Sequence, residues 1–252
     1  MLRQEYLRRL VDEAHVELYL SANDGARLFW PWRMQPPSQA TKSYRDACER
    51  YVIDSDPLDD NVTTEDVLDT AHRLDAEVAS LQDVYQNKDA TVDSLLDGFE
   101  IYDDHAFDGE LLLPLQDPFV DCYYELGEPD GHLIGIGGLK DGTTHERISA
   151  VEGFRAEFGS NVWLHGFGWG PTTHLARFIR NNPNAIDSLD YSTPIQNASG
   201  GGDLPGKERM SVVAMDAGRQ LIADLRACSP YIKDSAEELR ADKSQQGLEV
   251  FE

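Results

Sequence analysis

The chain has 252 residues, and its 46 Asp and Glu residues outnumber its 22 Lys and Arg residues, which gives a formal net charge of −24. This length suits one α/β barrel with a full core, so we expect a single domain over residues 1–240 and a disordered tail over residues 241–252. No apolar run approaches the ~20 residues that a membrane span needs. Residues 1–17 are charged and have helical spacing, unlike a signal peptide. We therefore expect a cytoplasmic protein with no membrane partner.

The acidic composition would repel a polyanion in ordinary buffer, which argues at first against a nucleic-acid substrate. A strongly acidic chain with few lysines is also typical of proteins from a high-salt cytoplasm, that of a halophile or of a halophile's virus. At about 1 M salt the Debye length is roughly 3 Å, so only close contacts between charges matter. Net charge therefore does not exclude DNA or RNA, and we expect folding stability to rise with the KCl concentration.

The cysteines exclude the common zinc motifs. Cys48, Cys122 and Cys228 are far apart and odd in number, and no Cys-x-x-Cys or Cys-x-Cys pair is present. We interpret them as buried thiols in a reducing cytosol, and we expect neither a metal site nor a bound cofactor.

The chain alternates short apolar runs with amphipathic segments. The runs predict strands at residues 16–20, 51–53, 77–81, 110–115, 132–136, 161–164 and 185–189, with a further candidate at 211–215 that could instead begin a helix. Helical spacing occurs at residues 64–74, 90–99, 144–157, 172–180 and 217–239. Threonine pairs at 63–64, 143–144 and 172–173 predict helix N-caps. Seven or eight alternating strands favour a single (β/α)8 TIM-like barrel, which could be irregular or incomplete, over an open doubly wound sheet.

Two carboxylates, Asp187 and Asp190, lie at the end of the predicted strand 185–189. Reactive residues of a (β/α)8 barrel sit at the carboxyl ends of its strands, so either acid is a candidate nucleophile. In a chain with 46 acidic residues, such a pair can also arise by chance.

Polar groups also follow other predicted strands, and together they suit a planar base. Asp54, Asp83 and Gln116 each come just after an apolar run, and a carboxylate with an amide can read the donor and acceptor edge of a purine. Gly137 and Gly138 would let a base approach the backbone closely. A phosphate loop is the alternative, but the Gly-x-Gly-x-x-Gly spacing is missing.

One histidine and two tryptophans in these regions each have two possible roles. His165 could act as a base or metal ligand, but a lone histidine favours a pocket wall or a hydrogen-bonded spacer. Trp30 and Trp32 could stack on nucleic-acid bases, or they could simply cover one end of the barrel.

Six short segments within about residues 51–199 together resemble the tRNA-guanine transglycosylase superfamily. They are similar above all to its viral and bacterial DpdA-type branch, which inserts 7-deazaguanines into DNA. In chain order the segments are Ile53-Asp54-Ser55, Gln82-Asp83, Leu115-Gln116, Gly135-Ile136-Gly137-Gly138-Leu139, Leu164-His165-Gly166-Phe167-Gly168 and Ile186-Asp187-Ser188-Leu189-Asp190.

The resemblance implies base exchange through a covalent intermediate. Asp190 would attack C1′ of a deoxyguanosine and form a glycosyl-aspartate, with Asp187 as the second candidate, and 7-cyano-7-deazaguanine (preQ0) would replace the expelled guanine. Asp54 would be the general acid and base. The residues expected to bind the base are Asp83, Gln116, Gly137, Gly138, Leu139 and His165.

The chain also departs from the tRNA enzymes. It lacks their Cys-x-Cys-x-x-Cys zinc subdomain and an added RNA-binding domain, and Asp190-Tyr191-Ser192-Thr193-Pro194 lacks the arginine found after their nucleophile. These departures favour DNA as the partner. Exchange on tRNA and a non-catalytic barrel that binds a base within a modification complex remain the alternatives, and a helper protein is compatible with each.

Overall fold

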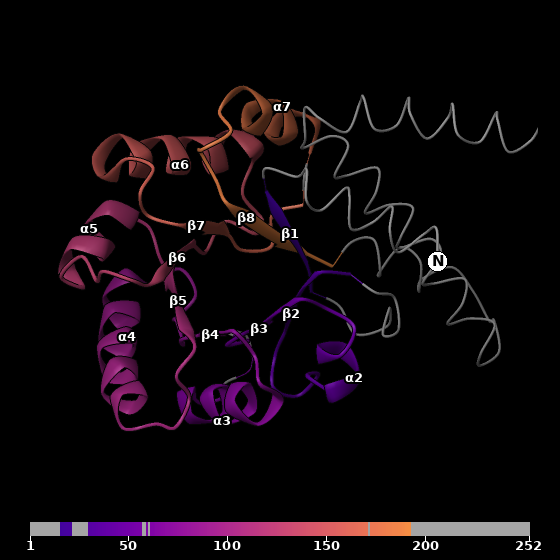
Figure 1. The fold of residues 1–252 in the computed structure, drawn as a ribbon. Helices are drawn as coiled ribbons and strands as arrows, with labels where there is room; N and C mark the ends of the chain where they lie inside the picture. The colour runs from indigo at the N-terminus through magenta and orange to yellow at the C-terminus, as the bar shows by residue number, and fades with distance from the viewer. Residues whose placement is uncertain (1–15, 22–29, 57–58, 60, 171, 193–252) are drawn as a thin grey trace, which may run out of the picture.

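The computed structural model describes residues 16–21, 30–56, 59, 61–170 and 172–192. In this part of the chain eight parallel strands follow one another around a closed barrel, and helices lie outside the strands (Figure 1). The predicted (β/α)8 barrel is confirmed. The expected strand at 211–215, helix at 217–239 and tail at 241–252 lie outside the described residues, as does Cys228. None of the described helices is long and apolar enough to cross a membrane.

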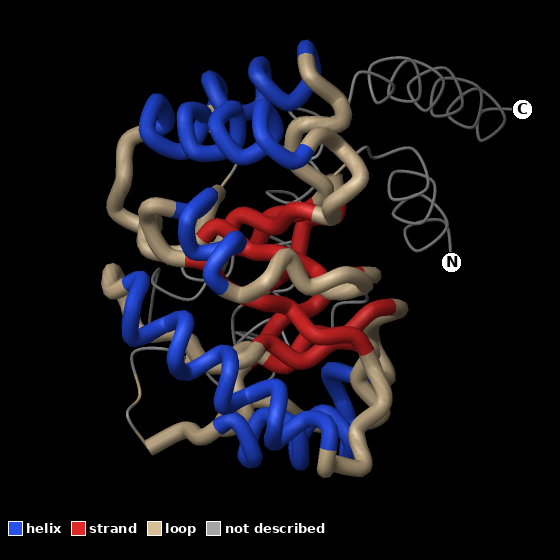
Figure 2. Tube along the Cα trace, turned by 90° about the vertical axis from the view of Figure 1, so that its left-hand side faces the viewer, coloured by secondary structure: helices blue, strands red, loops and turns tan. Residues whose placement is uncertain are grey.

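The barrel is built from short strands that are buried almost throughout. The strands are β1 (Glu17–Leu20), β2 (Trp32–Gln35), β3 (Arg50–Ile53), β4 (Val78–Ser80), β5 (Glu110–Leu115), β6 (Leu133–Ile136), β7 (Leu164–Gly166) and β8 (Ser188–Tyr191). The helices are α2 (Lys42–Arg45), α3 (Thr64–Leu74), α4 (Lys88–Asp103), α5 (Phe119–Glu125), α6 (Thr144–Phe158) and α7 (Thr173–Asn181). A view turned by 90° shows the strands between these helices (Figure 2).

Strand β2 was not predicted, because its polar residues hide the apolar pattern of a strand. Arg33 is fully buried, and its guanidinium lies 5.0 Å from the ring centroid of Tyr44 in α2. Gln35 is also buried and accepts a hydrogen bond of 2.7 Å from the Tyr51 hydroxyl. Tertiary contacts with α2 and β3 thus make a strand of a segment whose composition indicates none. The short helices α2 and α5 were missed as well.

The last two strands begin about three residues later than predicted. β7 starts at Leu164 rather than at 161, and β8 starts at Ser188 rather than at 185. The apolar residues Ala185 and Ile186 are buried just before β8 begins, which explains why the pattern indicates an earlier start. This shift decides which acid lies at the strand end.

A cluster at the amino-terminal end of the barrel identifies its inner face. We call Glu17, Arg50, Glu110 and Trp163 the basal cluster. Arg50 Nη2 lies 2.5 Å from Glu110 Oε2, and Nη1 lies 3.8 Å from Glu17 Oε1. The guanidinium is also 5.6 Å from the Trp163 ring centroid. These residues begin β1, β3 and β5 or directly precede β7, so their contacts must cross the barrel interior.

The strand register extends this inner face to the other end of the barrel. Tyr19 pairs with Asp190, and His165 pairs with Ser188. Paired residues of neighbouring parallel strands share a face, as do residues two apart on one strand. Asp190, Ser188, His165 and Tyr19 therefore all point into the barrel.

The predicted helix caps fix where the chain turns after each strand. Thr63 and Thr143 each form a capping box, with Asp66 and Glu146 respectively. The Thr172 side chain accepts a hydrogen bond from the Leu175 backbone N–H at the start of α7. Each cap stabilises its helix by about 1 kcal/mol. The helix starts thus lie near the carboxyl ends of the strands, which form the mouth of the barrel.

The tryptophans and two of the cysteines belong to the core. Trp30 is fully buried, Trp32 is 8% exposed, and Trp30 Nε1 donates a 2.7 Å hydrogen bond to the Leu18 carbonyl. Neither ring therefore offers an open stacking face. Cys48 and Cys122 are buried free thiols, as expected.

Candidate active site at the barrel mouth

Four of the predicted site residues come together at the carboxyl ends of the strands. Asp54 directly follows β3, Asp83 lies three residues beyond β4, Gln116 directly follows β5, and Asp190 is the third residue of β8. Loops after barrel strands converge on one mouth. The fold therefore assembles three carboxyl groups and one amide from segments that are widely separated in sequence.

Asp54 is the most perturbed acid at this mouth. Burial, together with the negative charges of Asp190 and Asp83, raises its pKa from 3.8 to about 8. The side chain keeps some exposed surface, so it can still meet a ligand. At neutral pH Asp54 is consequently a protonated acid beside two other carboxyl groups, which is the state that a general acid requires.

Asp83 and Gln116 form a connected pair. Gln116 Nε2 donates a 2.5 Å hydrogen bond to Asp83 Oδ2, and the Gln86 backbone N–H donates to Gln116 Oε1 at 3.0 Å. Both bonds orient the amide in the same sense, with its NH₂ group toward Asp83. Burial raises the pKa of Asp83 to about 6, although the bond from Gln116 opposes that shift. The pair presents one carboxyl group in a defined orientation.

Gly137 and Gly138 make room for this amide. A Cβ atom at Gly137 would lie 2.5 Å from Gln116 Nε2, and one at Gly138 would overlap Gln116 Oε1. Gly138 also has φ +68°, a conformation that favours glycine. The structure shows that these glycines make room for the Gln116 side chain. That they also admit a base stays a prediction. Leu139 follows them, and its carbonyl accepts a 3.1 Å hydrogen bond from Arg147 Nε in α6.

Asp190 lies deeper than Asp54, and two nitrogen atoms contact one of its carboxylate oxygens. The Gly168 backbone N–H donates to Oδ1 at 2.5 Å, and His165 Nε2 lies 3.3 Å from the same oxygen. The side chain is 11% exposed. Both nitrogens meet the same carboxylate oxygen, so the carboxylate is contacted from one side.

His165 lies beneath Asp190 rather than on the wall of the mouth. It is 1% exposed, and its Nδ1 lies 2.6 Å from the Ser188 hydroxyl oxygen. Sequence reasoning did not single out Ser188. The two-residue repeat of a strand was the available signal, since it places Ser188 on the same face as Asp190.

Asp187 is not brought together with the other predicted residues. It precedes β8 and lies at the amino-terminal end of that strand. Its Oδ2 accepts 2.9 Å and 2.7 Å hydrogen bonds, from Arg155 Nη2 and from the Leu164 backbone N–H. These contacts join α6, β7 and β8, so the geometry gives Asp187 a structural position.

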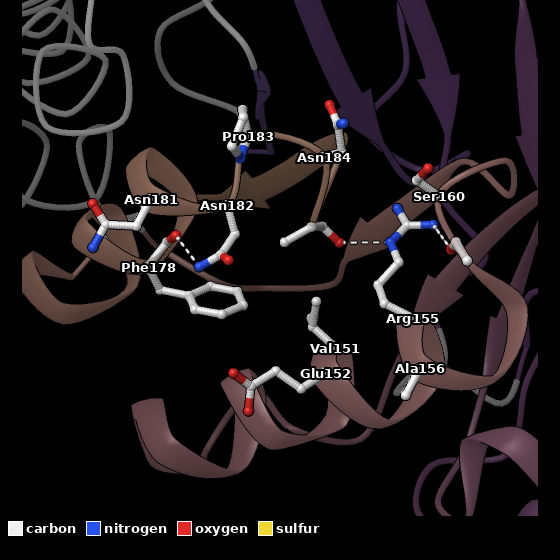
Figure 3. Close-up of a pocket in the computed structure, with 12 residues that line it drawn as sticks. Val151, Glu152, Arg155, Ala156, Ser160, Phe178, Asn181, Asn182, Pro183 and Asn184 are labelled. Carbon is white, nitrogen blue, oxygen red and sulfur yellow. Dashed lines mark hydrogen bonds between the residues drawn. The ribbon is translucent and has the colours of Figure 1, made fainter.

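A groove of about 530 Å³ lies near Asp187, between α6, α7 and the segment before β8 (Figure 3). Arg155 lines it, but its guanidinium already donates to the carbonyls of Ala185, Gly159 and Val162 as well as to Asp187. The groove is at the opposite end of the barrel from Asp190. Within the described ranges, no three His, Cys, Asp or Glu side chains are grouped to hold a metal ion.

Comparisons with known proteins bear on the fold alone. No family model matches the chain, and no curated protein matches it in sequence. A proposed fructose-1,6-biphosphate aldolase from Coccidioides immitis is similar in structure, with a TM-score of 0.61 and 11% identity over 89% of this chain and 96% of that one. The YdjI aldolase from Escherichia coli K12 gives a TM-score of 0.58 and 10% identity over 90% and 96%. Such low identities show a shared barrel and carry no activity across.

Proposed function

We propose that the protein is an enzyme that exchanges bases in DNA, replacing guanine with a 7-deazaguanine such as preQ0. The observation that carries this proposal is that Asp54 and Asp190 lie at the same barrel mouth in different environments. Asp54 has a pKa of about 8, while one oxygen of Asp190 contacts the Gly168 N–H and His165 Nε2. Two carboxyl groups whose environments differ in this way suit an acid and a nucleophile.

The two groups divide the reaction into two steps. Asp190 attacks C1′ of the deoxynucleotide while Asp54 gives its proton to the departing guanine, so the C1′–N bond breaks and a C1′–O bond to Asp190 forms. Asp54, now ionised, then takes a proton from the incoming base. The nitrogen of that base attacks C1′ and releases Asp190.

The Asp83–Gln116 pair supports a role in binding the base. Asp83 keeps partial exposure beside the mouth, and the Gln116 amide is held by Asp83 and Gln86. A carboxyl group can accept hydrogen bonds from the amino and ring N–H groups of a guanine-like base. The choice of DNA over tRNA rests on the sequence departures from the tRNA enzymes.

Labelled preQ0 tests the proposal directly. We would incubate the purified protein in molar KCl with duplex DNA or with tRNA, digest the nucleic acid and identify labelled nucleosides by mass spectrometry. Label in a deoxynucleoside is the expected result, and Asp190→Ala and Asp54→Asn should abolish it. Asp97→Asn, which changes an exposed acid on α4, is the matched control and should retain exchange.

The other outcomes correspond to the alternatives. Label in ribonucleosides alone would replace the DNA substrate with tRNA. Binding of preQ0 without exchange or a covalent adduct, on either nucleic acid, would refute catalysis by this chain alone. Exchange that survives Asp190→Ala would refute the assignment of the nucleophile.

A further inference from the structure

Ser188, His165 and Asp190 form one chain of hydrogen bonds inside the barrel. The Ser188 hydroxyl oxygen lies 2.6 Å from His165 Nδ1, and His165 Nε2 lies 3.3 Å from Asp190 Oδ1. These residue types also make up the triad of serine hydrolases. Here their order relative to the opening is reversed, since Ser188 is fully buried and Asp190 is the most exposed of the three. Ser188 therefore cannot serve as a nucleophile for a substrate that enters at the mouth.

Aromatic side chains fix the plane of the His165 ring. Trp163 stacks on it with a centroid distance of 6.2 Å and an interplanar angle of 6°. Tyr19 and Phe167 contact it edge-on, at 5.9 Å and 4.7 Å. A ring held on three sides keeps its two nitrogens aimed at Ser188 and at Asp190.

The partners decide which nitrogen carries the proton. A carboxylate only accepts hydrogen bonds, so Nε2 must be the N–H that faces Asp190. In a neutral ring Nδ1 is then an acceptor, and the Ser188 hydroxyl must donate to it. The hydroxyl thereby selects the tautomer, as the partner of one ring nitrogen does in other histidine sites.

We propose that Ser188 and His165 are a positioning pair that holds the Asp190 carboxylate for attack. Among the described residues, the hydrogen bonds to Asp190 from His165 and Gly168 both end on Oδ1. Oδ2 is then the oxygen directed to the substrate. The catalytic part of this inference rests on the proposed function, whereas the hydrogen-bond pattern does not.

The expected size of the effect follows from the role. A reacting group displaced by about 1 Å can lose about 100-fold in rate. Loss of the Ser188 donor loosens the ring without removing it, so we expect Ser188→Ala to slow formation of the Asp190 adduct by about 10-fold with unchanged KM for DNA. His165→Ala removes one of the two contacts to Asp190 Oδ1, and we expect a loss of about 100-fold.

Nitrogen NMR tests the hydrogen-bond pattern without any assay of activity. In ¹⁵N-histidine-labelled protein at neutral pH, long-range ¹H–¹⁵N correlations distinguish the two neutral tautomers from imidazolium. His165→Gln assigns the signal. A proton on Nε2 is the expected result. A ring whose only proton is on Nδ1 would overturn the positioning pair even if base exchange is observed.

A double-mutant cycle tests the catalytic part. The Gln amide can place its nitrogen where His165 Nε2 lies, so His165→Gln should keep more activity than His165→Ala. In the His165→Gln background, Ser188→Ala should have no further effect, because its partner Nδ1 is gone. Equal losses in both backgrounds would show that Ser188 acts only in packing. Thermal melting of each variant separates these effects from unfolding. A wild-type protein that forms no adduct would refute the proposed base exchange, but it would not refute the assignment of the His165 tautomer.

Discussion

Replacing Asp54 with asparagine should change how folding stability depends on pH. In the folded protein the pKa of Asp54 is about 8, against an ordinary value of 3.8. Between these two pH values the folded state holds a proton that the unfolded state has lost. Stability therefore falls as pH rises, by about 1.4 kcal/mol for each pH unit, and it stops falling above pH 8.

The size of the effect can be worked out for a practical pH range. Between pH 6 and pH 9, a single group with these two pKa values lowers the free energy of unfolding of the wild type by about 3 kcal/mol. The asparagine side chain of the variant carries no charge and removes this loss. For a protein of this length, 3 kcal/mol corresponds to a change in Tm of roughly 6–12 °C. The partial exposure of Asp54 makes both figures upper limits.

The assay is thermal or urea unfolding of wild type, Asp54→Asn and Asp97→Asn at several pH values in molar KCl. The difference in stability between Asp54→Asn and wild type should grow in favour of the variant from pH 6 to pH 9. Asp97→Asn should follow the wild-type curve, since Asp97 lies exposed on α4. Parallel curves for wild type and Asp54→Asn would refute the raised pKa, and with it the argument that Asp54 is a protonated acid at neutral pH.

Other substitutions separate structural from catalytic roles. Asp187→Ala removes the acceptor of the hydrogen bonds from Arg155 and from the Leu164 N–H. Urea unfolding should therefore show a loss of about 1–3 kcal/mol in the free energy of unfolding, while the adduct on Asp190 still forms. Loss of the adduct in a folded variant would instead support Asp187 as the nucleophile. In Gly138→Ala a Cβ atom would sit on a left-handed backbone and clash with the Gln116 amide. We expect the free energy of unfolding to fall by about 1–2 kcal/mol, and calorimetry should show preQ0 binding weakened by about 10-fold or more. Unchanged binding would show that the position of that amide does not matter for the base.

The strand ends were predictable where burial and polarity change abruptly. Asp54, Asp83 and Gln116 each follow a run of buried apolar residues, and the structure places them at the mouth as the pattern indicates. The threonine caps before α3, α6 and α7 were also predictable, because a cap depends on residues only three positions apart.

Other features depend on residues that are distant in sequence. The fully buried Arg33 gains its environment from Tyr44 and α2, so β2 has no local apolar signal. The link from Ser188 to His165 joins residues 23 positions apart. The role of Asp187 depended on the starting residue of β8, and strand boundaries are the weakest part of a prediction from periodicity.

If the protein exchanges bases as proposed, the basal cluster has a consequence for the order of events. Arg50 links Glu17 and Glu110 across the barrel and faces Trp163, so side chains fill the end opposite the mouth. A base that leaves must then use the opening through which its replacement arrives. In the proposed reaction the guanine leaves before its replacement binds at the same place, so the glycosyl-aspartate would have to outlast the interval between them. During that interval water is the competing acceptor, and each hydrolysis would leave an abasic site in the DNA.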